Sequence, residues 1–193
     1  MSAVSAPLLG EPLPIELANT AYAVRGEPRE GLDTVEALAD WLEANNDRLP
    51  WKLSPQDLAA LGDFELTAAR ELRDAIRTVA SAITDDDTDG AAPSGGAIET
   101  INHHARWAPQ WQELQWEAEP AARVRSAAPP VTATFSYIAQ AAIELFVRQR
   151  ADLRACQGPG CVLFYLQDRP QRRWCSAACG NRARAARHYA RHR

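Results

Sequence analysis

Apolar residues recur at helical spacing through most of the first 150 residues, which is typical of helices that bury one face. Residues 13–18 begin a short helix or an extended segment. The same spacing predicts longer helices over residues 35–44, 55–61, 64–83, 97–107 and 131–153. Thr34 and Ser54 are placed as N-caps of two of them, since their hydroxyls can accept from the first free N–H groups. The first 150 residues are therefore expected to be mainly helical.

Two other patterns interrupt the helices. Alternating apolar and polar positions over residues 111–117, with a second run around 122–126, predict a small β-hairpin. Residues 85–96 are rich in Asp, Gly, Ser and Pro, which is typical of a linker. No stretch approaches the twenty apolar residues of a membrane span, so none is expected. The helix over 131–153 leads into the last forty residues without a flexible linker.

The last forty residues contain all four cysteines, as Cys156-x4-Cys161 and Cys175-x3-Cys179 with thirteen residues between the pairs. Two cysteine pairs at this separation are typical of a four-thiolate zinc site. Disulfides, ordinary buried cysteines, an iron–sulfur cluster and a redox pair are the alternatives. The start of the chain lacks the basic and apolar run of a signal peptide, so a cytoplasmic location is expected, where thiols stay reduced. That location favours Zn²⁺.

The residues around the cysteines predict a finger of about forty residues. An apolar run over 162–166 suits a strand, and residues 172–174 are expected to form its return strand after a turn. Ser176 then caps a helix that runs to about residue 192. A knuckle, a hairpin and a helix, with two cysteines at each end, describe a treble-clef-like zinc finger over 151–193. The fold prediction is a mainly α protein with a helical domain over 1–150.

Cys179-Gly180-Asn181-Arg182 resembles the signature of the CGNR zinc fingers. In that family the finger follows a helical domain described as a bacterial stress-induced transcription regulator. The N-terminal domain of the family opens with a pattern matched here by Asn19, Thr20, Arg25 and Trp41-Leu42. The resemblance implies Zn²⁺ as the cofactor and nucleic acid, most simply DNA, as the partner.

The charge distribution supports that implication. The net charge is −4, yet residues 1–147 hold ten Lys or Arg against twenty-three Asp or Glu, whereas residues 148–193 hold eleven Arg against two Asp. From Arg169 onward there are eight Arg, two His and no acid. A basic end on an acidic body is a footprint of nucleic-acid binding. The acidic body could instead dock on the basic end and cover it.

On a helical wheel the last helix has two sides. Cys179, Ala183, Ala186 and Ala190 share the side expected to face the metal and the hairpin. The opposite side is expected to contact nucleic acid, and carries Asn181, Arg184, Arg187, His188 and Arg191. A charged stripe is also typical of a plain solvated face. Arg182 falls near the inward side and is expected to brace the zinc thiolates or the neighbouring helix. Arg172 and Arg173 could contact either nucleic acid or the acidic body.

The N-terminal domain offers weaker candidates. Asn19, Thr20, Arg25 and Trp107 could line a pocket for a small-molecule effector, although most of the tryptophans are expected in the core. His103 and His104 are expected as exposed or half-buried residues at a helix end, and a metal or ligand role is the alternative. No catalytic motif is present, so an enzyme is not expected. The helix over 131–153 is the expected contributor to a homodimer, unless it lies wholly inside the chain. The function predicted is a DNA-binding transcription regulator; the alternative is a protein-interaction module whose zinc finger is only structural.

Overall fold

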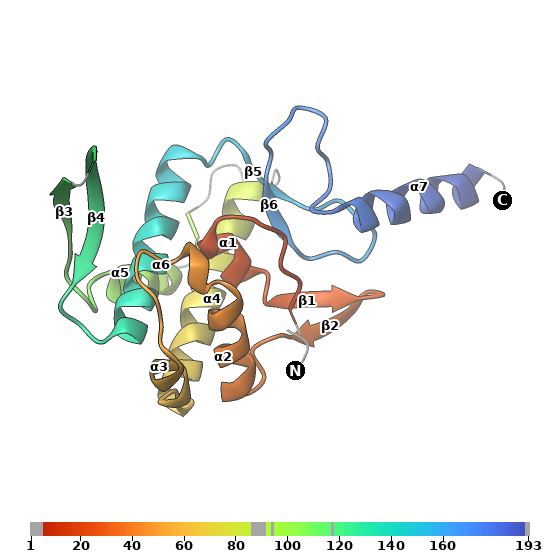
Figure 1. Ribbon diagram of the computed structural model, residues 1–193. Helices are drawn as coiled ribbons and strands as arrows, with labels where there is room; N and C mark the ends of the chain where they lie inside the picture. The colour runs from red at the N-terminus through yellow and green to blue at the C-terminus, as the bar shows by residue number, and fades with distance from the viewer. Residues whose placement is uncertain (1–5, 86–91, 94, 117, 192–193) are drawn as a thin grey trace.

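The computed structural model describes residues 6–85, 92–93, 95–116 and 118–191, and helices dominate it (Figure 1). Its helices are α1 (Leu13–Ala18), α2 (Val35–Ala44), a 3-10 turn η1 (Asn46–Arg48), α3 (Pro55–Ala59), α4 (Asp63–Thr84), α5 (Gly95–Ala105), α6 (Pro130–Arg148) and α7 (Ala177–Arg191). Its strands are β1 (Ala21–Val24), β2 (Glu27–Glu30), β3 (Gln110–Trp116), β4 (Pro120–Ser126), β5 (Leu153–Ala155) and β6 (Phe164–Leu166).

The core lies where α4 and α6 pack with the short helix α1, every residue of which is buried. Helix α6 buries Phe135, Ile138, Ala142 and Leu145 on the face that the spacing predicted. That apolar face lies inside the chain, and the homodimer stays a prediction. Arg73, the polar member of the apolar face of α4, is also buried, because Glu30 and Asp74 pair with its guanidinium.

The predicted helix starts are confirmed. The Thr34 hydroxyl accepts from the Ala37 N–H at 3.2 Å and caps α2. Ser54 and Asp57 form a reciprocal capping box at the start of α3. One predicted end is wrong, because α6 stops at Arg148 and the chain turns back through residues 149–152 into β5. The turn lets Leu153 enter the core from a strand, an outcome that the local sequence does not signal.

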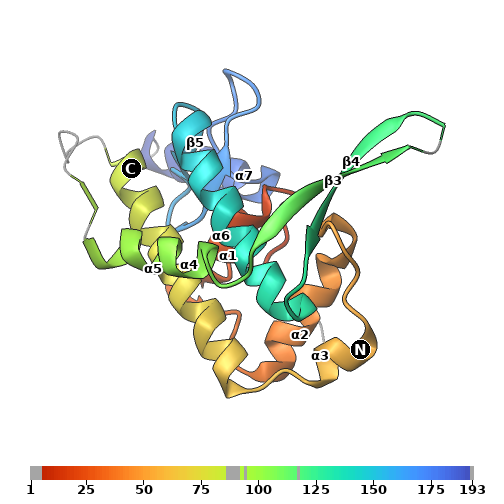
Figure 2. The same ribbon diagram turned by 90° about the vertical axis from the view of Figure 1, so that its left-hand side faces the viewer.

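Each pair of strands forms a separate two-stranded antiparallel sheet. The predicted hairpin is confirmed as β3–β4, and it projects from the helices as an arm that exposes Leu114 and Trp116 (Figure 2). The β1–β2 hairpin was not predicted. Its turn is Arg25-Gly26, with positive φ at both residues (56° and 87°). Of the two residues, only the glycine is typical of such a turn in a sequence.

The third sheet corrects the predicted finger. Strand β6 pairs with β5, which precedes the first cysteine, and residues 172–174 form no strand. The pairing of β6 with β5 buries apolar side chains, because Leu153 of β5 and Phe164 of β6 both lie in the core of the helical body. The sheet therefore joins the finger to the body.

Helix α6 is the one helix of the described residues whose length and apolar composition would allow it to cross a membrane. Eight of its residues are buried against the rest of the chain. A core helix needs apolar residues to pack in this way, so the packing of α6 within the fold accounts for its apolar composition.

Candidate metal centre and nucleic-acid interface

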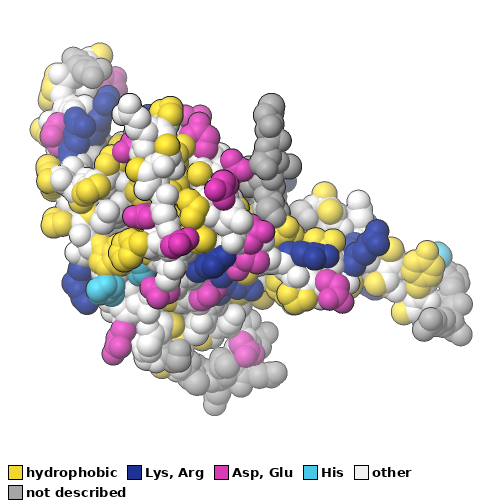
Figure 3. Space-filling model, turned by 90° about the horizontal axis from the view of Figure 1, so that it is seen from below, with side chains coloured by type: hydrophobic (Ala, Val, Ile, Leu, Met, Phe, Trp, Pro, Cys, Tyr) yellow, Lys and Arg dark blue, Asp and Glu magenta, His cyan; other side chains and the backbone are white. Residues whose placement is uncertain are grey.

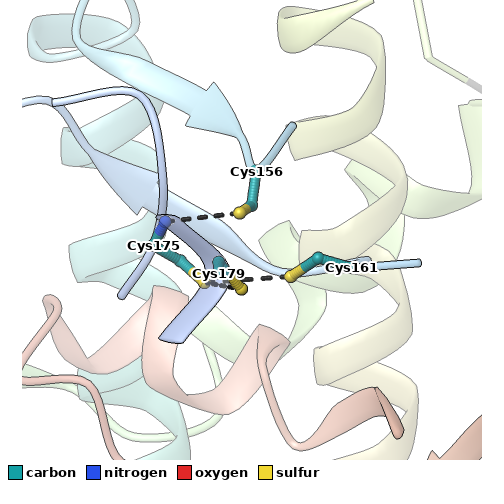
Figure 4. A group of neighbouring side chains, drawn as sticks. All are labelled: Cys156, Cys161, Cys175 and Cys179. Atoms are coloured by element: carbon teal, nitrogen blue, oxygen red, sulfur yellow. Dashed lines mark hydrogen bonds between the residues drawn. The ribbon is translucent and has the colours of Figure 1, made fainter. Parts of the chain in front are cut away.

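The four cysteines meet at one point between β5, β6 and the start of α7 (Figure 4). Their sulfur atoms all lie within 4.8 Å of one another. Cys175 Sγ is 3.8 Å from Cys161 Sγ and 3.5 Å from Cys179 Sγ. Four thiolates bound at about 2.3 Å in a tetrahedron stand about 3.8 Å apart, so these distances suit a zinc ion. The predicted cysteine cluster is present, and no disulfide forms among its members.

The electrostatics of the cluster favour a bound cation. The neighbouring Cys156 thiol and burial raise the pKa of Cys161 to about 11. The Cys156 and Cys161 thiols and burial also raise the pKa of Cys175, so Cys161 and Cys175 keep their protons when no cation is bound. A divalent cation displaces those protons and holds the ligands deprotonated. Soft sulfur donors in this number favour Zn²⁺ over Mg²⁺ or Ca²⁺.

The loop between the first two cysteines is shaped by close approaches of its backbone. The Gly158 and Cys175 N–H groups donate to Cys156 Sγ at 3.4 and 3.3 Å. A Cβ on Gly158 would lie 2.9 Å from Cys179 Cβ. Gly160 has φ +67° and would meet Gly26 at 3.1 Å, so the β1–β2 turn rests against this loop. Glycine at these positions lets the sulfur atoms come together.

Two side chains complete the other half of the centre. Ser176 Oγ accepts from the Cys179 N–H at 3.3 Å and so caps α7, as predicted. The Arg182 Nη2 donates to Cys179 Sγ at 2.9 Å. A guanidinium at this distance offsets the surplus negative charge that four thiolates leave around one Zn²⁺.

Arg172 is engaged within the protein. Its guanidinium pairs with the buried Glu11 carboxylate and donates to the carbonyl oxygens of Leu166 and Cys175 at 3.0 and 3.2 Å. It also lies over the Tyr165 ring, 4.7 Å from the centroid. These contacts join the finger to the first helical segment and leave the side chain little freedom to reach a phosphate.

Asn19 makes the second joint between body and finger. Its Nδ2 donates to the Phe164 carbonyl and its Oδ1 accepts from the Phe164 N–H, both at 2.9 Å. A third joint is Arg77, which donates to the Val162 carbonyl at 3.2 Å and covers the Phe164 ring. Sequence reasoning missed Glu11 and Arg77. Arg77 sits on α4 without any pattern that distinguishes it from a solvated arginine.

The four residues predicted as an effector pocket are not brought together. Asn19 and Thr20 are fully buried, and Thr20 Oγ1 donates to the Leu17 carbonyl at 2.8 Å. Arg25 lies in the exposed β1–β2 turn. Trp107 follows α5, where its ring stacks on Phe64. Its ring also lies 4.2 Å, centroid to centroid, from the ring of the buried His104.

Helix α7 extends away from the body (Figure 1), and every residue from Arg184 to Ala190 is exposed. The expectation that Ala186 and Ala190 pack on the finger is therefore wrong, and contact with the finger ends near Ala183. The cause is that residues 172–174 form no strand, so no second sheet edge lies beneath the helix. The side chain of Arg191 is outside the described residues.

The arginines of this region are not covered by the acidic body. Among the described residues, no acidic side chain forms an ion pair with Arg173, Arg184 or Arg187. Arg184 instead donates to the Asn181 side chain, and Arg187 Nε donates to the Ala183 carbonyl at 3.3 Å. On the face of the molecule that Figure 3 shows, most acidic side chains lie on the helical body, and arginines lie along the projecting finger. Asn181 and His188 are exposed on the same helix.

A hollow of about 450 Å³ lies between the loop before α7 and the first turns of that helix. Arg173, Trp174, Gly180 and Arg184 contribute to its walls. A Cβ on Gly180 would lie 3.2 Å from the Trp174 ring, so the absent side chain lets that ring pack against the helix. The hollow is positively charged and opens beside the exposed helix.

Comparison with known protein families gives two matches. The family model ABATE, described as "Putative stress-induced transcription regulator", matches residues 11–149. The CGNR zinc finger model matches residues 153–192. A search of curated proteins finds no match to the chain.

Proposed function

The chain belongs to the ABATE family and carries a CGNR zinc finger, and we propose that it regulates transcription by binding DNA through that finger. Zn²⁺ is the cofactor, and the four clustered cysteines fit it. The observation that carries the proposal is the exposure of α7 with its arginines. Because the acidic body leaves these side chains open, they are available to phosphate.

The local structure supports a treble-clef-like finger. Cys156 and Cys161 flank a loop between two short strands, and Cys175 and Cys179 lie at the start of a helix. In this arrangement Zn²⁺ fixes the direction in which α7 leaves the body, because one ligand lies in the first turn of the helix. The metal centre then supports the interface without touching the nucleic acid.

The arginines of the finger divide into two groups by their contacts. Arg172 and Arg182 support the structure, since the first holds Glu11 and the second donates to Cys179 Sγ. The proposed nucleic-acid contacts come from the exposed side chains Arg173, Asn181, Arg184, Arg187 and His188, together with Arg191 at the end of the helix. The acidic body would be repelled by phosphate, which restricts contact to the finger.

The decisive experiment is DNA binding across a salt series. Replacing Arg173 and Arg187 by alanine should weaken binding to every sequence and flatten the plot of log K against log salt by about two units, since each lost phosphate contact removes about one. Zinc content should not change, because neither side chain contacts a cysteine sulfur. The control is the Arg123→Ala, Arg125→Ala variant, which removes the same charge from the β3–β4 arm at the other end of the molecule (Figure 1). Equal behaviour of the two variants would refute the proposal.

The remaining parts of the proposal follow from the role of a regulator. We place the protein in the cytoplasm, without catalytic activity of its own. A small-molecule effector and a homodimer stay predictions. The alternative function, a protein-contact module with a structural zinc finger, is favoured by one observation, the arm that exposes Leu114 and Trp116. That alternative predicts that the zinc-loaded protein does not bind DNA at low salt.

A further inference from the structure

Helix α7 lacks the support that helices of this length ordinarily have. From Arg184 to Ala190 all of its sides are exposed, and Tyr189 keeps 72 % of its surface open. An isolated helix shorter than about twelve residues is only marginally stable in water, because its stability comes mostly from packing. A surface that encloses the helix, rather than one flat contact, would supply that packing.

The side chains of α7 limit what that surface can be. This part of the helix contains no acid, so pairing with α7 of a second copy would bring like charges together. Alanines at 183, 185, 186 and 190 keep the helix slim. A slim helix about 10 Å across fits the major groove of B-form DNA, which is about 12 Å wide and lined by phosphates. The major groove of duplex RNA is too narrow and deep for it.

We propose that α7 enters the major groove of double-stranded DNA, an inference that rests on the proposed function and names the form of nucleic acid and the groove. At about 100° per residue, Asn181, Arg184 and His188 share one face, which points to the base edges. Ala185 and Arg187 lie on the two flanks, about 70° and about 90° from the middle of that face, and meet opposite phosphate walls. Ala186 lies opposite the face and points out of the groove.

This arrangement assigns a reading role to the polar side chains of the face. Arginine can donate two hydrogen bonds to guanine O6 and N7, and asparagine can pair with adenine N6 and N7. In the free protein Arg184 and Asn181 are paired with each other, and the bases would replace that pairing. Arg173, in the wall of the hollow beside the first turns of α7, is placed to hold the phosphate where the helix enters the groove.

The matched variants Ala185→Glu and Ala186→Glu test the orientation. Both residues are exposed and adjacent on α7, so both changes add one negative charge with little effect on folding. In the groove, glutamate at 185 faces a phosphate wall and should weaken binding to a duplex DNA by about tenfold or more, whereas glutamate at 186 should weaken it by less than about threefold. Equal losses, or a larger loss at 186, would overturn the proposal. Melting temperature and zinc content verify that both variants are folded.

A second measurement uses the unmodified protein. A duplex DNA in which 7-deazaguanine replaces guanine lacks the N7 acceptor in the major groove, and it should bind severalfold more weakly than the ordinary duplex of the same sequence. Netropsin, which fills the minor groove, should not compete. Binding that is unaffected by 7-deazaguanine, or equally tight to the matching RNA duplex or single strand, would refute major-groove entry while leaving nucleic-acid binding intact. If the protein bound none of these nucleic acids, the proposed function itself would be refuted.

Discussion

Asn19→Ala tests whether the finger and the helical body form one cooperative unit. Asn19 is fully buried and makes two hydrogen bonds of 2.9 Å to the backbone of Phe164, a strand residue of the finger. Alanine would leave the N–H and the carbonyl of Phe164 buried without these partners. Each such group costs about 1–3 kcal/mol, so the free energy of unfolding should fall by about 2–6 kcal/mol. A side chain far from the cysteines in sequence would then affect the metal centre.

The chain provides a matched control within the body. Asn46 makes the same pair of hydrogen bonds to the backbone of Leu53, at 2.9 and 2.8 Å, and has no contact with the finger. Asn46→Ala should destabilise the protein in urea to a smaller extent, because that site is only half-buried. It should not change the concentration of chelator that removes zinc from the folded protein.

The assay combines urea unfolding with zinc release to a colorimetric chelator. Asn19→Ala should release zinc at a chelator concentration at least about tenfold lower than the parent protein requires, since each 1.4 kcal/mol of the lost stability corresponds to about a factor of ten. Asn46→Ala should release it as the parent does. The reasoning fails if Asn19→Ala loses less than about 1 kcal/mol, or if the two variants release zinc alike.

Four further predictions follow from the structure. Cys175→Ser should lower zinc from about one per chain by metal analysis, and a full zinc content would contradict the ligand set. Gly158→Ala should reduce zinc retention, because its Cβ would lie 2.9 Å from Cys179 Cβ, whereas Gly96→Ala in α5 meets nothing within 4 Å and should be neutral or stabilising by up to about 1 kcal/mol. Burial lowers the pKa of His104 to about 4, so below about pH 6.5 the unfolded chain binds a proton at this residue that the folded chain does not bind. The free energy of unfolding should therefore fall by about 2 kcal/mol from pH 7 to pH 5, and His104→Gln should make that decrease smaller. Leu114→Ser with Trp116→Ser should leave the melting temperature nearly unchanged, since both side chains are 73 % exposed, and light scattering of the two proteins reports whether the arm contributes to a dimer.

The sequence predicted most of what local patterns determine. Helix spacing located α2, α4 and α6, and hydroxyl caps located the starts of α2 and α3. The cysteine pairs predicted the metal cluster because ligand spacing is set by short-range geometry. In each case the residues that form the pattern and the element they predict lie within about twenty residues of each other in the sequence.

The errors arose where distant segments decide the outcome. Leu153 lies in a strand and not in the predicted helix, because the strand places its side chain in the core. Strand β6 pairs with β5 because each strand contributes an apolar side chain to that core. The contacts of Glu11 with Arg172 and Leu166 join residues more than 150 positions apart, and nothing in either segment announces the other. The exposure of Ala186 and Ala190 was missed for the same reason, since a wheel gives the sides of a helix but not what lies beside it.

The sheet that joins finger and body makes metal availability a determinant of the whole fold. Leu153 and Phe164 belong to the core of the helical body, and the strands that carry them flank the loop with the first two ligands. Because zinc binds the folded chain, each tenfold rise in free zinc above the dissociation constant adds about 1.4 kcal/mol to stability. In a zinc-starved cell the unfolded fraction would rise, and proteases would remove the chain. The amount of this regulator would then follow the supply of an ion that most of its residues never touch.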